Sequence, residues 1–227
     1  MCGRTALVAT PGDLRDAFGL DALPEVIPRY NVPPSEPVAA VRVLRGSPRR
    51  SLEMLRWGLL PPWAEDAKVG HKLTLARVET VATTRAFQAA LRERRCLVVV
   101  SGFFEWKRAG KGPSQPYYVH RKDLRPMALA GLWERWTSRD GEIVESCAIV
   151  TQEARPPVDA IHDRMPLVLE PPEWDPWLDP AHHDVGSLLV AHQPELAAHP
   201  VSPRVNDPRH DDPSCLEPAM PTQGSLF

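Results

Sequence analysis

The chain has 227 residues, of which 43% are hydrophobic, and this suits one globular domain with a real apolar core. Its formal net charge of −2 excludes a protein that coats nucleic acid by bulk positive charge, so any nucleic-acid site must be a local basic patch. The four cysteines form no zinc or redox pair, and no apolar run reaches signal-peptide or transmembrane length, so we expect a soluble cytoplasmic protein.

The first half of the chain predicts short strands interrupted by turns rich in Pro and Gly. Thr10 before Pro11 is typical of a helix start, and Gly19 is typical of its end. In chain order we expect a strand over 3–10, a helix through Phe18, a Pro-rich loop over 21–36, strands over 37–44 and 50–57 joined by a turn at 45–48, and a helix over 83–95.

The second half predicts more strands and a polar end. Residues 96–100 form a continuous apolar run typical of a buried strand, and Gly102 indicates a bend directly after it. Further strands are expected over 103–107, 116–120, 127–133 and 143–151, a turn at 110–113, a hairpin around Asp140-Gly141, an element over 158–164, a strand near 167–169 and helices near 172–178 and 180–191.

These elements sum to an α+β fold: one domain over 1–207 with a mostly antiparallel, curved or barrel-like sheet and short peripheral helices. The polar, Pro-rich segment 208–227 is predicted to be poorly ordered. Because no coiled-coil pattern or exposed apolar stripe is visible, we expect a monomer.

Cys2 is the first candidate for chemistry. Removal of Met1 would leave an α-amine and a thiol on adjacent carbons, and both groups are partly reactive at neutral pH. Such a pair captures an aldehyde as an imine and can then close a thiazolidine ring. It could equally act as a nucleophile in acyl transfer, or Cys could stand at position 2 by chance.

Glu105 is a candidate acid/base group within Gly102-Phe103-Phe104-Glu105-Trp106-Lys107. A carboxylate flanked by aromatic residues, straight after a buried strand, favours a raised pKa and proton transfer. The alternative is a surface glutamate on a half-buried strand, paired with Lys107.

Two further segments carry polar side chains at alternating positions. His162 and Arg164 would share one face of an extended chain, where they could hold an anionic oxygen and pass a proton; alternatively His162 is structural and bonded to Asp163. Arg77 suits a phosphate, unless it forms a surface pair with Glu79.

The sequence lacks a His-Glu-x-x-His pattern, a phosphate-loop glycine pattern and a dinucleotide fingerprint. The adjacent His182 and His183 would point in different directions on a helix. We therefore expect no metal and no cofactor.

Taken in order, the motifs resemble the SRAP family, the SOS-response-associated peptidase-like proteins. Each motif is weak alone, but the ordered set is specific and covers residues 1 to about 207. The matching elements are Met1-Cys2-Gly3-Arg4, Arg29-Tyr30-Asn31, Trp57-Gly58-Leu59 with Pro62-Trp63, Ala76-Arg77-Val78-Glu79-Thr80, Gly102-Phe103-Phe104-Glu105-Trp106, Ile161-His162-Asp163-Arg164-Met165-Pro166 and His199-Pro200-Val201-Ser202.

The resemblance implies a sensor and shield of abasic sites in single-stranded DNA, nucleoid-associated when bound and active in the DNA damage response. It implies that Cys2 forms a covalent thiazolidine crosslink with the sugar aldehyde through lyase-like imine chemistry. Glu105 would then be the general acid/base, and His162 would stabilise the sugar or the imine. The peptidase label fits removal of Met1, by another enzyme or by the protein itself. The residues implied to contact DNA are Arg4, Asn31, Trp57, Trp63, Arg77 and Arg164.

One position departs from the pattern of the family, which usually has Asn two residues before the Arg of the Ala-Arg-x-Glu-Thr motif. This chain has Leu75 there, and Thr74 would face the other side of a strand. Two alternatives therefore stay open beside covalent capture: a cysteine peptidase that uses the N-terminal nucleophile, and a noncovalent single-strand-binding module whose chemistry Leu75 impairs.

Overall fold

Five strands close into a barrel, in which all neighbours pair antiparallel except β10 and β4, which pair in parallel. The computed structural model describes residues 2–43, 49–108, 110, 112–182, 184–190 and 194–219. In order around the barrel the strands are β10 (Ile143–Glu153), β4 (Arg50–Trp57), β3 (Pro37–Val43), β6 (Arg95–Val100) and β9 (Met127–Thr137), and β9 pairs again with β10. The mostly antiparallel, barrel-like α+β fold expected from the sequence is confirmed.

Three short strands extend the barrel along β9 and β10. β5 (Leu75–Arg77) pairs in parallel with β10, β11 (Arg164–Pro166) pairs antiparallel with the end of β10, and β12 (Val168–Leu169) pairs with β9. Because β5 and β11 both pair with the last residues of β10, the motifs around Arg77 and Arg164 flank the end of β10 on its two sides.

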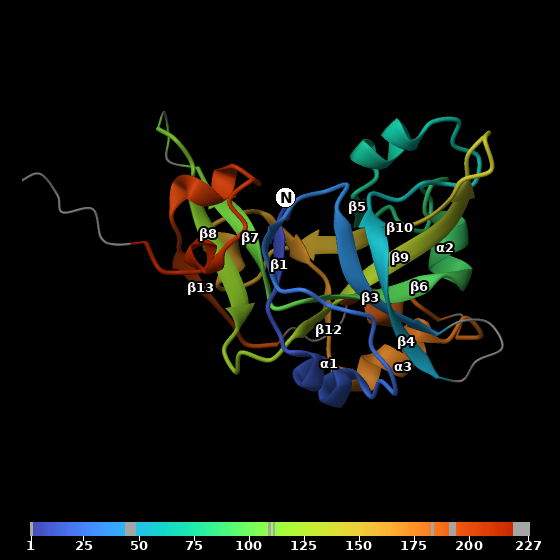
Figure 1. Cartoon of the computed structure of the whole chain (residues 1–227), viewed down its shortest axis with the longest axis horizontal. Helices are drawn as coiled ribbons and strands as arrows, with labels where there is room; N and C mark the ends of the chain where they lie inside the picture. Colours follow the sequence, from blue (N-terminus) through green and yellow to red (C-terminus); the bar gives the residue numbers. More distant parts are fainter. Residues whose placement is uncertain are drawn as a thin grey trace, which may run out of the picture.

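A second sheet of five strands lies beside the barrel (Figure 1). Its order is β13 (Leu196–Pro200), β8 (Gln115–Arg121), β7 (Gly102–Lys107), β1 (Thr5–Leu7) and β2 (Arg29–Val32). The N-terminal end of the chain, marked N, lies between this sheet and the barrel, and the first sheet strand, β1, sits in the middle of the molecule (Figure 1).

Three short α-helices lie outside the sheets. α1 (Pro11–Phe18) begins at the Thr10 cap, whose side chain accepts from the Asp13 N–H, and it ends at Gly19 in the left-handed region, as predicted. The other two are α2 (Gln88–Glu93) and α3 (Pro171–Leu178), with 3-10 turns η1 (Ala67–Lys72), η2 (Val158–Ala160), η3 (Ser187–Val190), η4 (Pro203–Asn206) and η5 (Pro213–Cys215).

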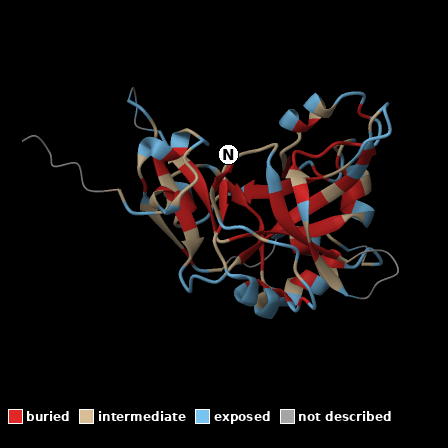
Figure 2. Ribbon diagram, in the orientation of Figure 1, coloured by how far each residue is buried: buried red, intermediate tan, exposed pale blue. Residues whose placement is uncertain are grey.

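The barrel strands are largely buried, apart from exposed positions such as Met54 on β4, and alternate residues supply two apolar clusters. Leu97 and Val99 belong to a cluster that also contains side chains of all three helices, so this face points outward and is covered. Cys96 and Val98 belong to the other cluster, which fills the barrel interior. Gly131 is required there, because a Cβ atom would lie 2.8 Å from the Cys96 Sγ atom. Figure 2 shows buried residues running from the barrel into the second sheet.

The structure differs from the sequence-based predictions in several segments. The helix expected over 83–95 is confined to Gln88–Glu93 and is preceded by turns, and the second half of the helix expected over 180–191 is a 3-10 turn. Four short strands were not predicted: β2, β5, β11 and β13. The predicted turn at 45–48 and part of the one at 110–113 lie outside the described residues, as do Met1 and His183.

The C-terminal segment is ordered further than its composition predicts. Residues 208–219 lie against β2, where the Asp211 carboxylate accepts hydrogen bonds from the backbone N–H groups of Tyr30 (2.5 Å) and Asn31 (3.0 Å), and Cys215 is buried. The predicted poor order is therefore wrong for 208–219, because buried polar pairing replaces the apolar burial that composition measures. Residues 220–227 lie outside the described residues. No helix in the described part of the chain is long and apolar enough to cross a membrane.

Candidate functional site

Cys2 lies just before β1, in a cluster that combines side chains of the barrel and of the second sheet. Its side chain is fully buried in the apolar cluster that fills the barrel interior, with Trp57 and Phe103 in the same cluster. Burial raises the pKa of the Cys2 thiol well above its usual value, and the Glu105 carboxylate raises it further. In the chain that still carries Met1, this group is therefore a neutral thiol and not a thiolate.

Glu105 lies in the middle of β7 and is fully buried, which excludes the alternative of a surface glutamate paired with Lys107. The pairing of β1 with β7 places Thr5 opposite Phe103, and the Phe104 N–H donates to the Arg4 carbonyl at 3.0 Å. The residues before Thr5 therefore run toward Glu105. Burial raises the pKa of Glu105 to about 7, so this carboxyl exists in both protonation states near neutral pH, as an acid/base group requires.

His162 lies between η2 and β11, and its side chain is 23% exposed. Its Nδ1 atom is 2.9 Å from the Arg164 backbone nitrogen and 2.7 Å from the Asp163 carboxylate, and these two contacts demand opposite protonation of Nδ1. The Asp163 side chain is 85% exposed, so water screens its attraction, whereas the backbone N–H can only donate. Burial lowers the pKa of His162, so the ring is neutral. Because Nδ1 accepts from the Arg164 backbone N–H, the proton of the neutral ring is on Nε2.

Arg164 and Glu79 form a two-pronged ion pair at the end of β10. The guanidinium donates to the two carboxylate oxygens at 2.6 and 3.0 Å, and to the Thr151 carbonyl at 2.8 Å. These bonds lower the pKa of Glu79. The surface pair considered for Arg77 and Glu79 is thus replaced by Arg164–Glu79, and the Arg77 side chain, opposite Thr151, is exposed.

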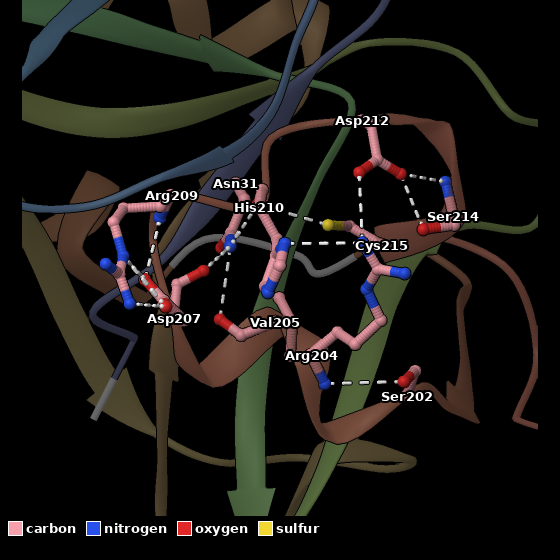
Figure 3. Close-up of polar contacts among 10 residues, drawn as sticks. All are labelled: Asn31, Ser202, Arg204, Val205, Asp207, Arg209, His210, Asp212, Ser214 and Cys215. Carbon is pink, nitrogen blue, oxygen red and sulfur yellow. Dashed lines mark hydrogen bonds and ion pairs between the residues drawn. The ribbon is translucent and has the colours of Figure 1, made fainter.

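Asn31 is an anchor for the C-terminal segment. Its side chain is fully buried and donates from Nδ2 to the carbonyls of Val205 (3.1 Å), Asp207 (3.2 Å) and His210 (2.7 Å). Figure 3 shows the amide surrounded by the loop that carries these groups. The Oδ1 atom accepts from Arg4 at 2.7 Å. Both polar atoms of the amide are thus bonded within the chain, and the predicted contact of Asn31 with DNA stays a prediction.

Arg4 connects this anchor to the strand that begins beside Cys2. One guanidinium nitrogen donates both to Asn31 and to the Val205 carbonyl at 2.8 Å. Arg4 is only half-buried, so its predicted contact with DNA stays a prediction. In this structure its pairing fixes the start of β1 against residues 202–215 (Figure 3 shows the loop).

The two tryptophans predicted to stack on bases have different environments. Trp57 is fully buried and its indole N–H donates to the Thr74 carbonyl at 3.0 Å, so the prediction of a base contact is wrong for this residue. Trp63 is 48% exposed, and the Arg85 guanidinium lies 4.9 Å from the centre of its ring. Arg85 was not predicted from the sequence. Its only signal is an Arg just before the helix that follows the Ala-Arg-x-Glu-Thr motif.

Leu75 begins β5 and packs against the same apolar cluster that holds Cys2 and Trp57. The position at which the family usually has Asn therefore supplies an apolar contact to the surroundings of the candidate nucleophile. Among the described residues, no three His, Cys, Asp or Glu side chains lie together as metal ligands.

Comparison with known proteins gives one consistent assignment. Residues 1–208 match the family described as SOS response associated peptidase (SRAP). The chain is 36% identical over 224 residues to the abasic site processing protein YoqW of Bacillus subtilis (strain 168), covering 96% of this chain and 99% of that protein. It is 29% identical over 269 aligned positions to the abasic site processing protein HMCES of Mus musculus, covering 96% of this chain and 76% of that protein.

The fold is also found in solved structures. A crystal structure of a protein from Bacteroides thetaiotaomicron superimposes with a TM-score of 0.82 at 23% identity, covering 96% of this chain and all of that one. At this identity the likeness concerns the fold alone.

Proposed function

Because the chain belongs to the SRAP family, we propose that it acts on abasic sites in single-stranded DNA as part of the response to DNA damage. We further propose that mature Cys2 forms a covalent thiazolidine crosslink with the ring-opened sugar. The observation that carries the proposal is the position of Cys2 at the start of β1, beside a fully buried Glu105 whose pKa burial raises to about 7. Such a protein binds DNA locally, in keeping with a net charge of −2.

The proposed reaction needs the amine and the thiol of Cys2 in turn. Removal of Met1 converts the Cys2 nitrogen from an amide into a primary amine, which attacks the C1′ aldehyde of the sugar. Loss of one water gives an imine, and addition of S–H across the C=N bond closes the five-membered ring and returns the thiol proton to nitrogen. No oxidant or other reactant is consumed.

Glu105 is proposed to move the protons of these steps. In its neutral form it protonates the departing hydroxyl of the carbinolamine, and in its ionised form it accepts a proton from the attacking amine or thiol. His162, with a pKa lowered by burial, presents a neutral ring and donates from Nε2 to a sugar oxygen. Because each proton transfer is reversible, Glu105 and His162 can also catalyse the reopening of the crosslinked ring.

The DNA strand is proposed to follow the side of the barrel where β5 and β11 end. The exposed Arg77 suits a phosphate, and Glu79 orients Arg164 next to it. The half-exposed ring of Trp63, faced on one side by Arg85, offers a surface for stacking a base. Arg4 acts from the start of β1, where its bond to Asn31 holds Cys2 in place.

A crosslinking assay tests this function. Mature protein is incubated with a single-stranded oligonucleotide that carries one abasic site, and the mixture is resolved on a denaturing gel. We expect a shifted band with the native protein and with Cys147→Ala, which removes another buried cysteine of the same cluster. Cys2→Ala keeps the terminal amine and should give a band only after borohydride reduction, because it forms an imine but no ring. No band with the native protein would refute the covalent function.

Leu75 supports a second candidate function. At this position the family usually has Asn, whereas Leu75 packs its apolar side chain against the cluster that contains Cys2 and supplies no amide there. In that case the protein binds single-stranded DNA without crosslinking it, and a native gel shows a complex that denaturation abolishes. Leu75→Asn separates the two candidates. If the departure impairs the chemistry, this variant crosslinks faster than the native protein; an unchanged rate shows that Leu75 is harmless.

A further inference from the structure

A cavity of about 760 Å³ lies between α1 and the second sheet, away from Cys2. Tyr118, which lines it, is opposite Phe104 in the register of β7 with β8, whereas Glu105 is opposite Tyr117. Since adjacent residues of a strand point to opposite faces, the cavity and Glu105 lie on opposite faces of this sheet. The cavity therefore does not belong to the crosslinking site.

Three aromatic rings gather at the wall of the cavity, from Tyr118, His120 and His199. The ring centres lie 5.5 Å apart for Tyr118 and His120, 5.7 Å for Tyr118 and His199, and 5.6 Å for the two histidines. β8 supplies the first two rings and β13 the third, because His199 is directly opposite Tyr118 in the sheet.

The backbone fixes which nitrogen of each histidine can accept a hydrogen bond. His120 Nδ1 is 2.7 Å from the Arg121 carbonyl, and His199 Nε2 is 2.8 Å from the Leu216 carbonyl. A carbonyl oxygen only accepts, so each of these nitrogens carries a hydrogen. The nitrogens left to accept a hydrogen bond are therefore His120 Nε2 and His199 Nδ1.

Tyr118 is a largely buried residue that lines the cavity, and its hydroxyl makes no hydrogen bond within the described part of the chain. The residue is 5% exposed, and its phenol end lies directly over Gly102, where a Cβ atom would come within 2.4 Å of the hydroxyl oxygen. Burial raises the pKa of Tyr118, so the phenol stays protonated. The hydroxyl oxygen keeps some accessible surface at the cavity, where a polar ligand can form a hydrogen bond with it.

The charge of the lining selects the ligand. Asp13, Asp16, Asp123 and Arg125 line the cavity, and because Arg121 pairs with Asp123 at 2.8 Å, two carboxylates remain against one guanidinium. An acidic lining repels phosphate and carboxylate groups and attracts a cation. The volume falls within the range of about 300–1,000 Å³ that is typical of small-molecule sites, and it is far larger than a single metal ion requires.

We propose that this cavity binds a small aliphatic amine in its ammonium form. The N–H groups of the ammonium donate to the free nitrogens of His120 and His199 and to the Tyr118 hydroxyl, the aromatic faces attract its charge, and Asp16 at the rim neutralises a second ammonium of a diamine. This function goes beyond the capture of abasic sites and does not depend on it.

Calorimetric titration with 1,4-diaminobutane tests the proposal, with 1,4-butanediol as an uncharged probe of the same length. We expect saturable binding of one diamine and no binding of the diol. Tyr118→Phe keeps the ring and removes the hydroxyl, and Asp16→Asn removes an exposed charge, so each should weaken binding about tenfold. The matched control Tyr117→Phe removes a hydroxyl from the other face of the same strand and should bind as the native protein does.

Three outcomes would overturn the proposal: equal binding of diol and diamine, diamine binding that Tyr118→Phe leaves unchanged, or saturable binding of zinc with no competition by the diamine. Far-ultraviolet circular dichroism shows whether each variant is folded. Cys2→Ala should bind the diamine with native affinity, so the result is separate from the outcome of the crosslinking assay.

Discussion

Replacement of Asn31 by alanine should destabilise the fold strongly, because Asn31 is an anchor and not a surface contact. The substitution removes the acceptor of one Arg4 bond and the donor to three backbone carbonyls, all at a side chain with no exposed area. A buried polar group left without its partner costs about 1–3 kcal/mol, and several such groups lose bonds here. We expect a loss of about 3 kcal/mol or more in the free energy of unfolding, which lowers Tm by roughly 6–12 °C in a chain of this size.

Urea unfolding followed by tryptophan fluorescence measures this loss, and Asn206→Ala is the matched control. Asn206 is exposed and makes one bond in the same region, from the Trp106 indole N–H at 2.7 Å, so its replacement should cost less than about 1 kcal/mol. Native stability of Asn31→Ala together with weaker DNA binding would refute the anchoring role and support the predicted contact with DNA.

Three other predictions concern the proposed site. Glu105→Gln should slow crosslinking and change the dependence of stability on pH. The stabilisation from a neutral Glu105 is full below pH 4.5 and is lost as pH rises through about 7, whereas a glutamine does not ionise. Measured by urea unfolding of proteins that retain Met1, the free energy of unfolding of the variant should therefore rise by about 3 kcal/mol relative to that of the native protein between pH 4.5 and 8. A constant difference across this range would show that Glu105 is not buried as a neutral acid. Arg77→Ala should weaken binding of single-stranded DNA at low salt and reduce the slope of log K against log salt by about 0.7, measured by fluorescence anisotropy; an unchanged slope means that Arg77 touches no phosphate. Trp63→Ala should weaken the same binding about tenfold if its ring stacks on a base, and equal affinities would exclude the stacking.

The barrel strands were predictable because their residue patterns are local. Residues 96–100 are apolar without interruption, and the strand they predict, β6, is buried over its whole length. The Thr10 and Gly19 signals bounded α1 correctly, since a cap and its stop lie within a few residues of each other. The pairing of β9 with β10 also follows from a local signal, the hairpin predicted around Asp140-Gly141. The closure of the barrel depends in addition on the parallel contact of β10 with β4, and no local pattern specifies that contact.

The candidate site was predictable in its residue types but not in its exposures. Glu105 and Cys2 stood out by neighbouring residues and position, yet only the fold shows that both are fully buried. Asn31 and Trp57 occur in motifs as distinctive as that of Trp63, but the first two stabilise the protein from inside while the third is open to solvent. A motif identifies a distinctive residue but does not show whether that residue contacts the ligand or stabilises the fold. That difference depends on packing against segments distant in the sequence, such as 202–215.

The second sheet has two faces with different chemistry, and this separation follows from the alternation of a strand. Glu105 points to the side of Cys2, while Tyr118 of the neighbouring strand lines the cavity with His199. A sheet is a stiff layer, so a ligand on one face acts on the other only by shifting the strands between them. The strand shared by both sites is β7, in which Gly102 makes room for Tyr118 and Glu105 serves the proposed reaction three residues later. Gly102→Ala would force a Cβ atom against the Tyr118 ring at 2.3 Å, so the change should displace β7 or the ring and affect both sites together, whereas Tyr118→Phe should affect the cavity alone.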